Sequence, residues 1–241
     1  HCISSAASDV YKRQVVTVLD GIRQKVSKDT RVLYAKGCAV RDSSRTGFKD
    51  AIETARNADA VVMVMGGSSA RDFSSEYEET GAAKVTINQI SDMESGEGYD
   101  RATLHLMGRQ LELLEEISRL GKPVVLVLIK GRPLLMEGAI QEAEAIVDAW
   151  YPGMQGGNAV ADVLFGDYNP AGRLTLSVPR SVGQLPVYYN TRRKGNRSRY
   201  IEEPGTPRYP FGYGLSYTTF SYTDMNCLLY TSDAADDMQC V

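Results

Sequence analysis

The sequence has little cysteine and histidine, and their placement argues against two common kinds of site. Three of its four cysteines, Cys2, Cys227 and Cys240, lie close to the two ends, and only Cys38 lies in the body of the chain. Only two histidines are present, and no C-x-x-C pair occurs, so a zinc site is not expected. The sequence therefore predicts neither a disulfide framework nor a metal centre, and it predicts no cofactor.

Long apolar runs and an excess of charge of one sign are also missing. No apolar stretch approaches the roughly 18 residues that a membrane-spanning helix needs. The 27 basic and 30 acidic residues are interspersed and give a net charge of −3. This balance provides no basic surface for nucleic acid and no polybasic patch for a membrane. With 241 residues, the chain is long enough to bury a sizeable core.

The two ends show neither helical nor strand periodicity. Residues 1–14 have the composition of neither a signal peptide nor a transit peptide, and residues 227–241 are equally patternless. Both ends resemble translated adapter sequence. We therefore expect a non-native or disordered leader over 1–14, a natural domain over 15–222 and a truncated or non-native tail over 223–241. The two ends should make few contacts with the domain, because they have little apolar surface to bury.

Short apolar runs alternate with amphipathic segments in the body of the chain. Continuous apolar runs that end in glycine or lead into a turn predict buried strands at 30–37, 61–65, 124–129 and 145–150. Apolar residues at helical spacing predict helices at 47–58, 104–120 and 156–166, with His105 in the core. Residues 15–23 fit a short helix or the end of a segment from a preceding domain. This alternation predicts an α/β fold: a mostly parallel sheet with helices on both faces, in a three-layer sandwich.

The pattern changes after Asp167. Residues 173–179 alternate as an exposed strand does, and residues 180–210 are rich in Tyr, Arg, Gly and Pro without any period. We expect a long irregular segment that wraps over the surface of the domain. In a compact domain, such a segment is more often functional than filler.

The densest cluster of charge lies between the strand at 61–65 and the helix at 104–120. Residues 91–101 contain four carboxylates and one arginine, and Gly96 and Gly98 flank Glu97. The backbone around Glu97 can therefore take conformations that residues with a Cβ avoid. A charged loop between a strand and a helix is where chemistry tends to occur, although a solvated surface loop is the alternative. We expect Glu97 on an exposed loop at one edge of the sheet.

Four segments, in order, resemble the second domain of glycoside hydrolase family 3. They are Ser95–Arg101 (Ser-Gly-Glu-Gly-Tyr-Asp-Arg), residues 149–157, residues 161–173 and residues 209–218. The resemblance implies an α/β sandwich that works beside a (β/α)8-type barrel, which carries the aspartate nucleophile and is absent here. Family members are mostly exo-acting, retaining β-glucosidases or β-xylosidases. The resemblance therefore implies a β-glucosidase-like domain, with a β-xylosidase or a non-catalytic carbohydrate-binding module as alternatives.

The family's Glu-Gly-x-Asp-Arg pattern assigns the general acid/base to Glu97. Retaining hydrolysis needs this carboxyl about 5–5.5 Å from a nucleophilic carboxylate, with a raised pKa so that it is protonated near neutral pH. A structural ion pair between Asp100 and Arg101 is expected to fix the loop. Tyr99 is expected either to stack on the leaving-group sugar or to pack the loop. Trp150, at a strand end, is expected either to contact sugar or to lie in the core.

The resemblance also implies the partners of the domain. The substrate would be an oligosaccharide or another β-glycoside, and the protein partner would be an N-terminal barrel of the same polypeptide. Neither nucleic acid nor a membrane is implied, and a periplasmic or secreted location is favoured by the family. On its own, the domain is not expected to hydrolyse glycosides. Glucose and xylose cannot be distinguished here, because most contacts to the scissile sugar should come from the barrel.

Overall fold

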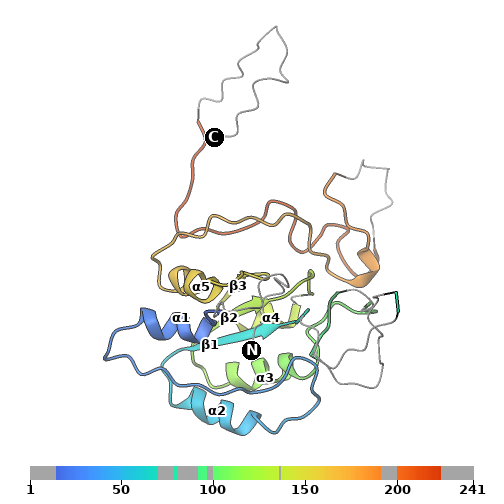
Figure 1. Cartoon of the computed structure of the whole chain (residues 1–241). Helices are drawn as coiled ribbons and strands as arrows, with labels where there is room; N and C mark the ends of the chain where they lie inside the picture. The colour runs from blue at the N-terminus through green and yellow to red at the C-terminus, as the bar shows by residue number, and fades with distance from the viewer. Residues whose placement is uncertain are drawn as a thin grey trace.

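The computed structural model describes residues 15–69, 79–80, 92–96, 100–135, 137–190 and 200–223 (Figure 1). Helices and strands alternate through this part of the chain, as the sequence predicts for an α/β domain. In chain order they are α1 (Val18–Lys25), α2 (Phe48–Arg56), β1 (Val61–Gly66), α3 (Gln110–Ser118), β2 (Val124–Ile129), α4 (Glu137–Glu142), β3 (Ala145–Asp148), α5 (Gly156–Leu164) and a 3-10 turn at Val182–Gln184. None of the described helices is long and apolar enough to cross a bilayer.

The three described strands form one parallel sheet in the order β1-β2-β3. Residues 61–66 of β1 pair with residues 124–129 of β2, and residues 125–128 of β2 pair with residues 145–148 of β3. Because all three strands run the same way, their carboxyl ends lie at one edge of the sheet. This edge, called the carboxyl edge below, is the side of an open α/β sheet where ligands bind.

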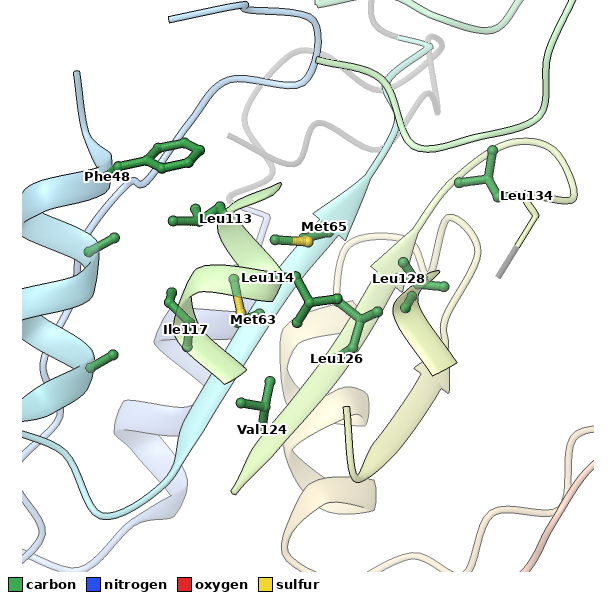
Figure 2. Packing of buried hydrophobic residues seen from close by; sticks show 13 residues of the cluster. Phe48, Met63, Met65, Leu113, Leu114, Ile117, Val124, Leu126, Leu128 and Leu134 are labelled. Carbon is green, nitrogen blue, oxygen red and sulfur yellow. The ribbon is translucent and has the colours of Figure 1, made fainter. Parts of the chain in front are cut away.

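Helices cover both faces of the sheet. On one face, α2, α3 and α4 pack over a core in which Leu114, Leu126 and Leu128 are completely buried. Figure 2 shows Leu114 of α3 next to Leu126 of β2 in this core. On the other face, α1 and α5 pack through Val18 and Val160 against β2. Each fully buried leucine stabilises the fold by about 1.5–3 kcal/mol. Because helices cover β2 on both faces, side chains that point to either face are buried, and the sequence of β2 is therefore apolar throughout.

Two glycines allow α1 and α5 to approach closely. A Cβ on Gly21 would lie 2.1 Å from the backbone oxygen of Gly157, and a Cβ on Gly157 would lie 2.0 Å from the backbone oxygen of Thr17. Real Cβ atoms do not come this close to backbone oxygen. The helices can therefore keep this separation only while both positions lack a side chain.

Gly157→Ala should destabilise the domain by about 1–3 kcal/mol or more, because the new methyl group must push α1 away from α5. Gly172→Ala is the matched control, since nothing lies within 4 Å of its Cβ position. The control should change stability by no more than about 0.5 kcal/mol. Urea unfolding followed by circular dichroism would measure both, and equal midpoints would contradict the close packing of the two helices.

Two predicted strands are wrong. Residues 30–37 form no strand; Ala35 and Cys38 instead pack against the core beneath α2 and α3. Their apolar pattern thus reflects contact with the helical layer rather than pairing with the sheet. Residues 173–179 also form no strand, and only an isolated antiparallel bridge joins Val178 to Tyr209.

The helix predicted at 104–120 begins later, at Gln110. Gly108 has a φ of +61°, which an α-helix cannot contain, so residues 104–107 remain irregular. His105 is consequently exposed and does not lie in the core, contrary to the sequence prediction. The short helix α4 was not predicted.

The described part of the chain beyond Asp167 is irregular apart from the 3-10 turn, as predicted for residues 180–210 but not for 173–179. Figure 1 shows this segment crossing the molecule on the α5 side. Backbone hydrogen bonds join its two arms, from Val178 N to Tyr209 O at 2.8 Å and from Leu174 N to Tyr213 O at 2.9 Å. The two arms are therefore joined to each other without forming a sheet.

Candidate functional site

Residues 93–95 are attached to the chain that leaves β1 at the carboxyl edge. The backbone oxygen of Ser68 accepts hydrogen bonds from the N–H groups of Glu94, at 2.8 Å, and Ser95, at 3.3 Å. Ser68 and Met93 form a parallel bridge, and the guanidinium of Arg41 donates to the Met93 oxygen at 3.0 Å. These bonds fix the backbone on the N-terminal side of the acidic loop.

Glu94 is the centre of a buried ion cluster. Only 1% of its side chain is exposed, and its Oε2 accepts a hydrogen bond from Nη1 of Arg101 at 2.6 Å. The Arg101 side chain is itself only 8% exposed, and it also donates to the backbone oxygen of His105. Arg132, which follows β2, places its Nε 3.7 Å from the same carboxylate oxygen. Two guanidinium groups thus compensate for the burial of one carboxylate.

Glycines beyond β1 and β2 make room for this cluster. A Cβ on Gly67 would lie 2.0 Å from Oε1 of Glu94, and a Cβ on Gly131 would lie 2.6 Å from the ring of Tyr151. The hydroxyl groups of Ser95 and Tyr151 are 3.0 Å apart and form a hydrogen bond. Residues 94–95 therefore contact the segments that follow all three strands.

A second charge pair also lies at the carboxyl edge, and in it only the lysine is buried. Lys130 is 1% exposed; its ammonium is 2.9 Å from Oδ1 of Asp148 and 3.8 Å from the centre of the Trp150 ring. Burial lowers the pKa of Lys130, and the attraction of Asp148 opposes this shift. Trp150 is half-buried and has a φ of +51°. Such backbone strain at a residue other than glycine is concentrated at functional sites.

The free energy of unfolding should depend on pH through Lys130. Because folding lowers its pKa below the ordinary value of 10.5, the unfolded chain binds more protons between the folded-state pKa and 10.5. The Lys130 contribution to stability should therefore rise with pH across this window, by at most about 1.4 kcal/mol per pH unit, and level off above it. Urea unfolding of the natural chain and of Lys130→Met at several pH values would measure the difference. A difference independent of pH would contradict the lowered pKa.

The predictions for the site residues agree with the structure only in part. Glu97 and Tyr99 lie outside the described residues, as do both predicted non-native ends apart from residue 223. The predicted Asp100–Arg101 pair is wrong, because Arg101 binds Glu94 and Asp100 is exposed. A buried guanidinium needs a buried counter-charge, which a solvated neighbour in sequence does not provide. Trp150 lies just beyond β3 at the carboxyl edge, where the sequence placed it.

Two features of the site were not predicted. The Ser95–Tyr151 hydrogen bond joins residues far apart in sequence, and no pattern indicates it. The Lys130–Asp148 pair had a signal, because a lysine directly after one buried strand and an aspartate at the end of the next carry opposite charges at one sheet edge. In the part of the chain that the structure describes, no group of three or more His, Cys, Asp or Glu side chains could hold a metal ion.

The model of the glycosyl hydrolase family 3 C-terminal domain matches residues 3–217. The chain belongs to this family. Among curated relatives of this family 3 domain, a β-xylosidase from Formosa agariphila is 44% identical over 210 residues, which are 86% of this chain and 26% of the relative. The periplasmic β-glucosidase of Salmonella typhimurium is 39% identical over 242 residues, covering 88% of this chain and 29% of the relative. The family predicted from the four segments is confirmed.

Solved structures similar to this chain include β-glucosidases. A β-glucosidase from Erythrobacter marinus has 37% identity and a TM-score of 0.71, over 87% of this chain and 29% of that protein. A mutant β-glucosidase from Listeria innocua in complex with laminaribiose has 31% identity and a TM-score of 0.69, over 86% of this chain and 26% of that protein. The family 3 domain thus spans between a quarter and a third of these proteins.

Proposed function

We propose that this chain is the second domain of a retaining, exo-acting β-glycosidase of the β-glucosidase type, which removes terminal β-linked sugars. The observation that carries the proposal is the family 3 match over residues 3–217, supported by relatives named β-glucosidase or β-xylosidase. The proposal requires a barrel domain, outside this chain, that carries the aspartate nucleophile. The domain alone lacks that nucleophile and is not expected to hydrolyse glycosides.

In this proposal, Glu97 donates a proton to the leaving sugar and later removes one from the attacking water. Its support is the position of its neighbours: Glu94 and Arg101 lie together at the carboxyl edge, where α/β sheets bind ligands. Tyr99 and Trp150 are proposed to stack on a sugar ring, because aromatic faces suit the apolar faces of pyranoses. Arg101 has a structural role.

A β-xylosidase of the same family is the second candidate, favoured by the 44% identity to the Formosa agariphila enzyme. A non-catalytic carbohydrate-binding domain is the third. The name of the Salmonella relative favours a periplasmic or secreted location.

The test is a reconstituted enzyme in which residues 15–222 of this chain replace the matching segment of the Formosa agariphila β-xylosidase. We expect it to hydrolyse 4-nitrophenyl β-xyloside, whereas the 241-residue chain alone should not. The same exchange into the Salmonella β-glucosidase should give a glucosidase, because the barrel supplies most contacts to the sugar. Folded but inactive hybrids, checked by circular dichroism, would instead support a non-catalytic domain.

A further inference from the structure

One buried ion pair joins both ends of the segment that carries Glu97. Residues 95–100 connect Glu94 to Arg101, whose side chains meet at 2.6 Å. We propose that Glu94 and Arg101 are positioning residues for proton transfer by Glu97, because they fix the two ends of the segment that carries it. This inference rests on the proposed function, because it takes Glu97 as the proton donor.

The Glu94 end of the segment is fixed by the sheet itself. Its N–H group donates to Ser68 O at 2.8 Å, beyond β1, and its carboxylate faces Arg132, beyond β2. Gly67 lies directly against this carboxylate, since a Cβ there would be 2.0 Å from it. A backbone hydrogen bond, the positive charge of Arg132 and packing against Gly67 thus fix the position of Glu94.

The Arg101 end depends on its guanidinium. Arg101 binds Glu94 and also donates to the backbone oxygen of His105, four residues later. This stretch is attached in turn to the chain after β2, because Leu135 N donates to Leu104 O at 2.8 Å. A planar guanidinium can reach two acceptors in different directions, which a lysine ammonium on a flexible stem does poorly.

Loss of this pair should slow proton transfer even in the molecules that remain folded. A displacement of about 1 Å at a catalytic group can slow a reaction about 10²-fold. The loss should appear only where the leaving group needs a proton. A variant that merely unfolds more would lose activity equally on every substrate, because its folded fraction falls.

The experiment compares two substrates in the reconstituted enzyme. Glu94→Gln and Arg101→Met should lower kcat/KM for xylobiose about 10²-fold, but change it less than about 3-fold for 2,4-dinitrophenyl β-xyloside, whose leaving group needs little protonation. Arg101→Lys should retain part of the xylobiose activity. Arg45→Met is the control, because it removes ion pairs from the residues before α2 to Glu112 and Glu116 of α3. It should leave the ratio of the two kcat/KM values unchanged.

Equal losses on both substrates in Glu94→Gln would overturn the positioning role. If Glu97→Ala also showed no dependence on the leaving group, the proposed function itself would fail. If Glu97→Ala showed that dependence and Glu94→Gln did not, only the positioning role would fail.

A second measurement needs no activity. In the 241-residue chain, Glu94→Gln should raise hydrogen exchange of the Leu135 amide, which donates to Leu104 O, about tenfold or more relative to the amides of β2. Exchange unchanged from the natural chain would show that the pair does not hold this segment.

Discussion

Glu97→Ala in the reconstituted enzyme should slow hydrolysis of xylobiose far more than hydrolysis of 2,4-dinitrophenyl β-xyloside. The sugar leaving group of xylobiose departs as an alkoxide and needs a proton in the transition state, whereas a dinitrophenolate hardly does. General acid catalysis is typically worth about 10²–10⁴-fold, so kcat/KM for xylobiose should fall by that factor. Steady-state kinetics on both substrates would measure the difference.

Azide should then accelerate the Glu97→Ala enzyme on the aryl substrate. The missing carboxylate can no longer activate water, but a small anion attacks the glycosyl-enzyme without a base. Glu116→Ala on α3 is the matched control, since Glu116 pairs with Arg45 and is not part of the Glu94 cluster. It should show neither the leaving-group dependence nor the rescue. If the two variants behaved alike, the proton donor would lie elsewhere, on the barrel.

Much of the fold could be predicted because each strand is a short apolar run, although only the central strand β2 is buried along most of its length. The apolar runs at 61–65, 124–129 and 145–150 match β1, β2 and β3 within a few residues. The same signal failed at 30–37, because an apolar run that packs against helices resembles one that pairs in a sheet. The helical spacing of apolar residues also led to a predicted helix that begins at 104. The positive φ of Gly108 keeps residues 104–107 out of the helix.

The candidate site could be predicted less completely. Charge density and flanking glycines drew attention to the loop at 91–101, but three of its carboxylates, Glu94, Glu97 and Asp100, could each have paired with Arg101. The choice of Glu94 depends on contacts from distant parts of the chain. Gly67 leaves space for its carboxylate, and Arg132 adds a second positive charge. These contacts exist only once the ends of β1 and β2 lie side by side, so local sequence does not reveal them.

Glu94→Gln should lower the free energy of unfolding of the 241-residue chain by about 3–5 kcal/mol. The change removes the negative charge but leaves Arg101, which is only 8% exposed, and the nearby Arg132 without their counter-charge. A buried charge that loses its partner retains the full penalty of leaving water, whereas an exposed one is hydrated again. Urea unfolding at neutral pH, followed by circular dichroism, would measure the loss.

Glu116→Gln is the matched control for this loss, because it removes the same charge from a more exposed ion pair whose partner Arg45 is 51% exposed. Its effect should be no more than about 1 kcal/mol. The double variant Glu94→Gln, Arg101→Met should be less destabilised than the sum of its two single variants, because it also removes one of the uncompensated charges. If Glu94→Gln and Glu116→Gln were equally mild, the Glu94 cluster would contribute no more than a surface pair, and the ion pair could not fix the loop.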